Sequence, residues 1–228
     1  MTVDVMFMAK NRLEFTRESF KRFWQNTNWK LVSHFVIYDD GSTDGTWEFL
    51  LDRASECKAE IRRTHLGSGL LVANDFVRRS KADIVAKIDN DAVYPPGWLE
   101  IGIGVLDRNP VLQILGLENM GLGGRMPYSF KASITGDGLW IARGSTFHGI
   151  ELPVPTDTYF GWGAWVINNR IQLGWLKPSI PVFLLDRVPI EPWCSLSREY
   201  EAKGWQRPWE RYTMEQSRLW SWCRWEDA

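Results

Sequence analysis

Short apolar runs alternate with amphipathic segments along the first half of the chain. Apolar runs of roughly four to eight residues are typical of buried strands, whereas apolar residues spaced three or four apart indicate helices. The pattern predicts strands at 3–8, 34–38, 60–64, 84–88 and 111–117, and helices at 11–24, 42–57, 69–80 and 98–108. Because strands and helices alternate with short connections, we expect an α/β fold with a doubly wound, mainly parallel sheet flanked by helices.

The second half has a different pattern, because glycine and proline interrupt it. It predicts short strands at 139–142 and 182–185, with a helix at 163–173 between them. Six of the 14 tryptophans lie in the last 36 residues. Since indole rings bury a large area, we expect residues 193–228 to form a helical segment that packs on the main domain. An acceptor platform or an interfacial membrane contact is the alternative for this segment.

Composition and charge exclude several classes of protein. The chain is 44% hydrophobic and 24% charged, as soluble globular proteins are, and its net charge of -1 gives no overall attraction to nucleic acid or anionic membrane. Three widely spaced cysteines without a CxxC pair argue against a disulfide framework and a cysteine zinc site. We read no signal peptide and no apolar run near the roughly 20 residues that span a bilayer. These features predict a cytoplasmic protein without a transmembrane segment.

The sequence AKIDND, residues 86–91, ends one of the predicted strands. In an extended chain residues i and i+2 point the same way, so the carboxylates of Asp89 and Asp91 can converge on one point. Two such hard oxygen donors suit Mg²⁺ or Mn²⁺ that keeps waters and accepts phosphate oxygens. Asp-x-Asp triplets are also frequent in turns, so this interpretation depends on the motifs around it.

Two further polar motifs follow predicted strands. The sequence YDDGSTDGT, residues 38–46, supplies helix N-cap residues, and the N-terminus of a helix favours anions. It is not an EF-hand, because the twelfth position of such a loop falls on Leu51 rather than on glutamate. The sequence HLGSGLLVAN, residues 65–74, enters a helix but does not match the dinucleotide fingerprint. His65 is expected to be a surface residue rather than a ligand.

Together these motifs resemble the inverting family 2 glycosyltransferases of the GT-A fold. The resemblance covers residues 3–97 and, more faintly, 138–175. It consists of AKNR after the first strand, YDDGSTDGT after the second, the helix entry that ends at Asn74, and KIDNDAVYPPGWL, in that order. The resemblance implies a GT-A domain at 1–192, with a nucleotide-binding half at 1–117 and an acceptor half at 118–192. The tryptophan-rich segment 193–228 would pack on this domain.

The resemblance also implies roles for individual residues. Asp39 and Asp40 would hold the base and ribose of the nucleotide, and Asn74 would lie near the ribose and diphosphate. Asp89 would contact the ribose or a metal-bound water, while Asp91 would ligate the metal directly; Asp89 is counted with Asp91 among the residues of the metal site. The residues that would border the nucleotide are Ala9, Asn11 and Arg12.

The sequence departs from the family pattern where the catalytic base is usual. The family's acidic pair falls on Gly163 and Ala164, although the arginine and the Gly-Trp that follow it are present. A base is needed to deprotonate the attacking hydroxyl, and Asp157 is the nearest replacement, followed by Asp137. Further candidates for the base are Glu151 and Asp186. A retaining reaction assisted by the donor's own phosphate is a second way to account for the missing pair.

Two residues of the second half have open roles. Trp162 can stack on the acceptor sugar or base, or it can pack in the core. His148 lies after a predicted strand and is a candidate for a third metal ligand.

The resemblance implies a metal-dependent enzyme that uses Mn²⁺ or Mg²⁺. It would move a sugar from a nucleotide-diphosphate donor, expected to be a UDP-sugar, to a hydroxyl of a glycan or lipid-linked glycan. One alternative acceptor is a hydroxylated base in DNA, since compact transferases of this kind occur in bacteria and their viruses. The other alternative is a domain that binds sugar or nucleotide without catalysis. A nucleotidyltransferase is disfavoured, because AKNR is not a glycine-rich phosphate loop.

Overall fold

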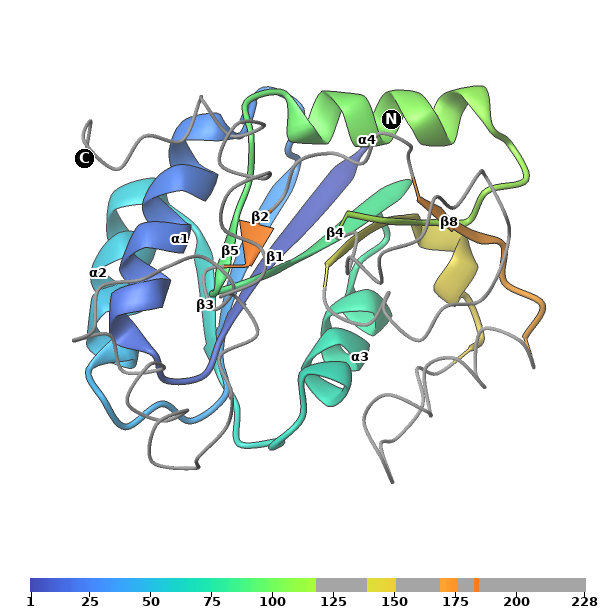
Figure 1. Cartoon of the computed structure of the whole chain (residues 1–228). Coiled ribbons are helices and arrows are strands. Elements are labelled where there is room, and N and C mark those ends of the chain that lie inside the picture. Colours follow the sequence, from blue (N-terminus) through green and yellow to red (C-terminus); the bar gives the residue numbers. More distant parts are fainter. Residues whose placement is uncertain (118–138, 151–168, 176–182, 185–228) are drawn as a thin grey trace, which may run out of the picture.

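A seven-stranded sheet with the order β3-β2-β1-β4-β7-β6-β8 forms the centre of the molecule (Figure 1). In this computed structural model the structure describes residues 1–117, 139–150, 169–175 and 183–184. The strands are β1 (Val3–Ala9), β2 (His34–Asp39), β3 (Glu60–Arg63), β4 (Ile84–Asp89), β6 (Ile114–Gly116), β7 (Trp140–Arg143) and β8 (Leu173–Trp175). Among these strands β7 alone is reversed, because it pairs antiparallel with both β4 and β6 while every other pairing is parallel. The expected mainly parallel sheet is confirmed.

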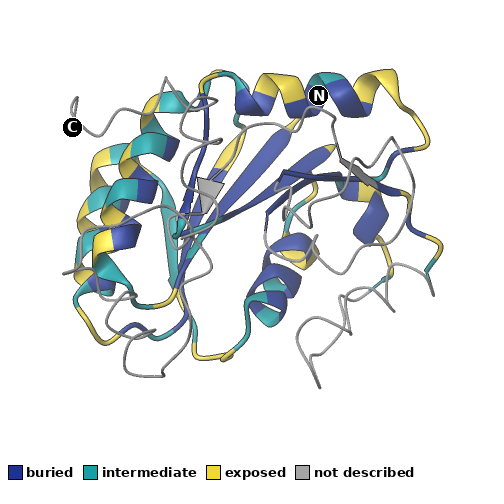
Figure 2. Cartoon of the chain, viewed as in Figure 1, coloured by how far each residue is buried: buried dark blue, intermediate teal, exposed yellow. Residues whose placement is uncertain are grey.

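Helices cover both faces of this sheet. One buried cluster joins the sheet to α1 (Leu13–Asn26), α2 (Thr46–Cys57) and α4 (Trp98–Arg108). A second cluster joins the opposite face to α3 (Gly69–Arg79) and the short 3₁₀ helix η1 (Gly144–Phe147). In Figure 2 the central strands are buried, while each long helix carries a buried and an exposed side.

The alternation of side chains along β1 explains why the sheet needs helices on both sides. Val5 and Phe7 belong to the first cluster, whereas Met6 belongs to the second. Successive residues of a strand point to opposite faces, so a continuous apolar run buries both faces. On the first face Phe7 packs edge-on against Phe20 of α1, with ring centroids 5.2 Å apart.

Two of the later predicted elements differ from the structure. The strand expected at 111–117 is limited to β6, because Val111 lies in a turn and is 66% exposed. The helix expected to reach Leu173 does not do so, because Leu173 begins β8 and pairs with Ile114 of β6. Long-range pairing overrides the local spacing there. Residues 163–168 of that prediction, and the segment 193–228, lie outside the described residues.

A small antiparallel pair of strands lies beside the main sheet. It consists of β5 (Ala92–Val93), directly after the acidic motif, and β9 (Phe183–Leu184). This pairing ties the chain that follows Asp91 to a segment about ninety residues later in the sequence.

The described helices include none with both the length and the apolar character that a membrane span requires. Cys57 is a free thiol, and its partial burial raises the pKa of the thiol above its ordinary value. A raised thiol pKa leaves little of the nucleophilic thiolate, so Cys57 is poorly suited to covalent chemistry. Cys194 and Cys223 lie outside the described residues.

The connections place a topological switch point at the centre of the sheet. From β1 the chain passes through α1 to β2 and through α2 to β3, all on one face; α3 then returns it on the other face to β4, beside β1. In doubly wound sheets ligands bind outside the carboxyl ends of the strands at such a point. The loops after β1, β2 and β4 therefore form the edge where a ligand site is expected.

Candidate functional site

The loops after β1 and β2 are bound to each other at this edge. Asn11 and Arg12 have left-handed φ values of 55° and 63°, so α1 begins at Leu13 rather than at the predicted Asn11. The Asn11 amide donates to Ser42 Oγ at 2.7 Å, and Asn11 Oδ1 accepts from the Thr43 amide at 2.8 Å. One hydrogen bond from the Asn11 backbone and one to its side chain thus fix Asn11 relative to the YDDGSTDGT motif.

Asp44 joins the starts of two helices. Its Oδ2 accepts from the Leu13 amide at 3.0 Å, and its Oδ1 accepts from the amide and hydroxyl of Thr46 at 3.1 and 2.6 Å. Leu13 and Thr46 are the first residues of α1 and α2. Partial burial raises the pKa of the Asp44 carboxyl, but the hydrogen bonds from Thr46 and Leu13 outweigh it and hold that pKa below its ordinary value. One carboxylate thus satisfies helix-end amides on both loops.

Asp39 ends β2 and is fully buried. Its Oδ2 accepts from the amides of Gly41 and Ser42 at 3.2 and 3.0 Å, and Arg63 Nε lies 3.5 Å from the same oxygen. The other oxygen, Oδ1, is buried and receives no hydrogen bond from any described residue. Leaving a buried acceptor unsatisfied costs about 1–3 kcal/mol. A ligand N–H group that reaches Oδ1 would therefore be favoured at this position.

Asp40 holds the loop that leads into α3. Its Oδ1 accepts from the Thr64 hydroxyl at 2.9 Å and the Leu66 amide at 2.6 Å, and its Oδ2 accepts from the Gly67 amide at 2.9 Å. Lys10 Nζ lies 3.5 Å from Oδ2. Both oxygens are engaged within the protein. Asp40 was expected to bind the nucleotide, but its carboxylate already stabilises the loop that leads into α3.

The acidic motif after β4 does not have the geometry that an extended chain would give it. The strand ends at Asp89, and Asn90 and Asp91 lie in a turn, so strand alternation does not set the direction of the Asp91 side chain. The two carboxylates have different partners. Asp89 Oδ1 lies 2.6 Å from Lys87 Nζ, and Asp91 Oδ2 lies 2.9 Å from Arg12 NH1.

Asn90, between the two aspartates, ties this turn to the loop after β1. Its side-chain amide donates to the Asn11 carbonyl at 2.9 Å and to Thr16 Oγ1 at 2.7 Å. Ser19 Oγ, one helical turn further along α1, donates to the Ala92 carbonyl at 2.6 Å. The turn that carries Asp91 is therefore held against the start of α1.

The carboxylates at the end of β4 fit a divalent cation that takes most of its coordinating oxygens from a bound phosphate and from water. The described residues contain no group of three or more His, Cys, Asp or Glu side chains arranged for a metal ion. Mg²⁺ is commonly held by one or two carboxylates together with phosphate oxygens and water, and two aspartates at one strand end meet that requirement. The residues able to hold such an ion are Asp91 and Asp89.

The two aspartates differ in how firmly each cationic partner is held. Lys87 is 2% exposed, whereas the Arg12 side chain is 36% exposed. Breaking a buried ion pair costs about 3–5 kcal/mol, whereas an exposed pair contributes about 0–1 kcal/mol. Asp91 can therefore exchange its partner at much lower cost than Asp89 can.

The structure does not bring His148 to this edge. Since β7 runs antiparallel to β4, η1 follows β7 at the amino end of β4, where the Gly144 amide donates to the Asp83 carbonyl at 2.8 Å. The six residues of β4 separate that end from Asp89 by about 17 Å. His148 therefore cannot complete a metal site with Asp91.

Of the other residues singled out in the sequence, three lie within the described part of the structure. Ala9 ends β1 and is buried, with its carbonyl accepting from the Asp40 amide at 2.9 Å, and Asn74 is a buried residue of α3. His65 is exposed, as expected, and its ring lies over Gly41. The remaining candidates, Asp137, Glu151, Asp157, Trp162 and Asp186, lie outside the described residues.

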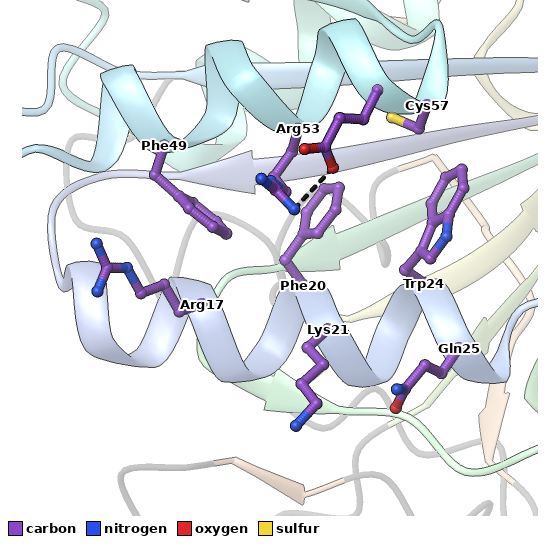
Figure 3. A pocket seen from close by; sticks show the side chains of 9 residues that line it. Arg17, Phe20, Lys21, Trp24, Gln25, Phe49, Arg53 and Cys57 are labelled. Carbon is purple, nitrogen blue, oxygen red and sulfur yellow. Dashed lines mark ion pairs between the residues drawn. The ribbon is translucent and has the colours of Figure 1, made fainter. Parts of the chain in front are cut away.

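A separate cavity of about 440 Å³ lies between α1 and α2 (Figure 3). Phe20 and Trp24 stack along one side of it, and the guanidinium groups of Arg17 and Arg53 lie 5.8 and 5.6 Å from the centre of the Phe49 ring. This cavity shares no residue with the edge formed by the loops after β1, β2 and β4.

Sequence reasoning missed Lys87 and the pairing of Arg12 with Asp91. A signal for Lys87 was present, because it is a lysine inside an otherwise apolar strand, two residues before Asp89. Buried charges are almost always paired, and residues i and i+2 of a strand share a face. The Arg12–Asp91 pair joins residues 79 positions apart and depends on the turn after β4, so no local pattern indicates it.

Comparison with known proteins agrees with this architecture. The profile of the family described as glycosyl transferase family 2 matches residues 4–163. No curated protein matches the chain in sequence. In structure, the chain is similar to TarS 1–349 of S. aureus, with a TM-score of 0.63, 15% identity, and 82% of this chain and 61% of that chain covered. TarS 1–349 is also known in complex with UDP-GlcNAc.

Two further similar structures contain a nucleotide and a metal. The mannosyltransferase PcManGT of Pyrobaculum calidifontis, in complex with GDP-Man and Mn²⁺, gives a TM-score of 0.58 at 14% identity, with 75% of this chain and 53% of that chain covered. Glucosyl-3-phosphoglycerate synthase of Mycobacterium tuberculosis, in complex with Mg²⁺ and UDP, gives 0.54 at 16% identity, with 75% and 67% covered. At these identities the structures show the shared fold, and the chain spans about three fifths of TarS 1–349. Because the family profile covers well over half of its residues, the chain belongs to glycosyl transferase family 2.

Proposed function

We propose that this chain transfers a sugar from a nucleotide-diphosphate donor, a UDP-sugar, to a hydroxyl acceptor, and that it requires Mn²⁺ or Mg²⁺. The observation that carries the proposal is the gathering of Asn11, Asp39 and Asp91 at the carboxyl ends of β1, β2 and β4, at the switch point of a family 2 domain. Ligands of doubly wound sheets bind at this position. The UDP-GlcNAc of TarS and the UDP and Mg²⁺ of the mycobacterial synthase support a donor of this class.

The chemistry of each residue suggests its role toward that donor. Asp39 Oδ1, a buried acceptor without a donor among the described residues, would accept an N–H of the base. Asn11 borders the same loop, and Asn74 would lie near the ribose and diphosphate. Asp91 would hold the metal and Asp89 would contact the ribose or a metal-bound water. The cation, when bound, neutralises negative charge on the departing diphosphate.

The acceptor side of the reaction rests on residues outside the described ranges. Attack by a hydroxyl with inversion needs a base, and we propose Asp157 for this role, with Asp137 as the second candidate. The proposed acceptor is a hydroxyl of a glycan or lipid-linked glycan. Trp162 is proposed to stack on the acceptor sugar.

A panel of nucleotide sugars tests the proposal. With Mn²⁺ present, the protein is expected to release nucleoside diphosphate by slow donor hydrolysis, and removal of the metal by a chelator is expected to stop the release. Pyrophosphate release from a nucleoside triphosphate would instead indicate a nucleotidyltransferase. Donor binding in calorimetry without any turnover would indicate a domain that binds and does not transfer.

Acceptors are then compared with the preferred donor. Glycans, lipid-linked glycans and DNA that contains a hydroxylated base form the panel, and transfer to the first two is expected. Asp157→Asn is expected to lower transfer to the acceptor by at least about 100-fold while donor binding is kept. An unchanged rate in that variant rejects Asp157 as the base and directs attention to Asp137.

A further inference from the structure

The Arg12–Asp91 ion pair lies across the switch point, between the loop after β1 and the turn after β4. Arg12 NH1 and Asp91 Oδ2 are 2.9 Å apart, and the two side chains are 36% and 18% exposed. We propose that this pair is exchanged when the donor binds: the divalent cation replaces Arg12 on Asp91, and the released guanidinium binds the diphosphate. This inference rests on the proposed function and adds to it a positioning residue that couples metal binding to nucleotide binding.

The asymmetry between the two aspartates selects Asp91 for the exchange. Asp89 Oδ1 lies 2.6 Å from Nζ of Lys87, a residue of β4 whose side chain is only 2% exposed. Arg12 ends at the surface, so its charged group can leave Asp91 and remain solvated. The cation therefore gains access to the carboxylate of Asp91, while Asp89 keeps its protein partner.

The backbone of Arg12 is fixed, so the exchange needs only side-chain rotation. The Arg12 carbonyl accepts from the Thr16 amide at 2.9 Å and from the Thr16 hydroxyl at 3.1 Å. The neighbouring Asn11 is fixed by Ser42 and Thr43. A guanidinium anchored in this way can present its planar fork to two phosphate oxygens, a geometry that lysine does not reproduce.

The charges balance before and after the exchange. Without ligand, Arg12 neutralises Asp91. With ligand, the two charges of the cation balance the two negative charges on the diphosphate of a nucleotide sugar, and the Arg12–Asp91 charges still cancel. A cation that binds without nucleotide, however, faces the positive charge of Arg12. The arrangement thus disfavours the metal alone and favours metal and nucleotide together.

Binding of Mn²⁺, followed by the electron paramagnetic resonance signal of the free ion, tests the exchange with and without UDP. In the unmodified protein UDP is expected to strengthen Mn²⁺ binding. In Arg12→Gln, Mn²⁺ alone is expected to bind about two- to five-fold more tightly, because the competing ion pair is gone, and the strengthening by UDP is expected to shrink. The opposite signs of these two effects distinguish exchange from a general loss of structure.

Two control variants accompany this experiment. Arg17→Gln removes the same charge from an exposed position on α1, where the guanidinium lies over Phe49, and is expected to leave both affinities unchanged. Arg12→Lys keeps the charge but loses the fork, so it is expected to bind Mn²⁺ alone as the unmodified protein does and to lose part of the UDP effect. Full strengthening by UDP in Arg12→Lys overturns the proposal even where Arg12→Gln does not fold.

The outcomes separate this inference from the function on which it rests. If the unmodified protein binds Mn²⁺ and UDP together but Arg12→Gln binds Mn²⁺ alone no more tightly, the exchange is refuted and the proposed function stands. If the unmodified protein shows no joint binding of Mn²⁺ and UDP, both proposals are refuted.

Discussion

The carboxylate of Asp44 is expected to stabilise the site loops by joining the starts of α1 and α2. Replacement by alanine removes the acceptors of the Leu13 and Thr46 amides and of the Thr46 hydroxyl. Replacement by asparagine keeps one oxygen and so retains one of the two helix contacts. The two substitutions therefore form a graded series at a single position.

The structure sets the size of the effect. Loss of a capping side chain at one helix costs about 0.5–2 kcal/mol, and Asp44 serves two helices. Because Asp44 is exposed, water replaces part of what is lost, and we expect Asp44→Ala to lower the free energy of unfolding by about 2 kcal/mol. Asp44→Asn is expected to cost about half as much. Asp52→Ala, on the exposed side of α2, is the matched control and is expected to stay within about 0.5 kcal/mol.

Urea denaturation of the three variants as a function of pH gives the assay. The folded-state pKa of Asp44 lies below its unfolded value, so the stabilisation is present above the unfolded pKa of about 3.9 and is lost as the pH falls through the folded pKa. The difference between the unmodified protein and Asp44→Ala should be constant from about pH 7 to 5 and should narrow below about pH 4.

Two results would refute this reasoning. Equal stability of Asp44→Ala and Asp52→Ala at neutral pH would show that the hydrogen bonds to Leu13 and Thr46 do not stabilise the fold. A stability difference that persists unchanged to low pH would show that the ionised carboxylate is not the group responsible.

Two further substitutions test the site's framework. Gly41→Ala is expected to lower the free energy of unfolding in urea by about 1–2 kcal/mol, because Gly41 has φ +77° and an added Cβ would lie 2.4 Å from His65 Nδ1. If adding His65→Ala to this variant restores all of the lost stability, backbone strain at Gly41 is refuted. Lys87→Met is expected to cost about 3 kcal/mol, because it removes the buried ammonium group that lies 2.6 Å from Asp89 Oδ1. The double variant Lys87→Met/Asp89→Asn is expected to regain most of this loss, and equal stabilities of the single and double variants would contradict the pairing.

Most of the strands and helices before Leu117 were predictable from apolar spacing, because each helix buries one apolar stripe and the central strands bury side chains in both clusters. The features that could not be predicted are those that tertiary contacts or loop conformation determine. The reversed direction of β7 follows from its pairing between β4 and β6, and that direction removes His148 from the site. The helix predicted at 42–57 begins only at Thr46, because the preceding Gly45 has a left-handed φ of 92° and is its N-cap residue.

The location of the site was easier to predict than its internal contacts. Motifs at the ends of β1, β2 and β4 had to meet, because the carboxyl ends of neighbouring parallel strands share one edge. The partner of each carboxylate depends on loop geometry that local sequence does not determine. Asp40 is engaged by a loop 24–27 residues away, and Asp91 is paired with a residue 79 positions earlier.

Calorimetric binding of UDP with and without Mn²⁺ tests most directly whether Asp91 anchors a metal–nucleotide site. The unmodified protein is expected to bind UDP more tightly when Mn²⁺ is present. In Asp91→Asn the increase in UDP affinity caused by Mn²⁺ is expected to be at least about tenfold smaller, while Asp107→Asn on the exposed side of α4 retains it. Binding of UDP that is indifferent to Mn²⁺, or an Asp91→Asn variant that keeps the full gain, would contradict the account.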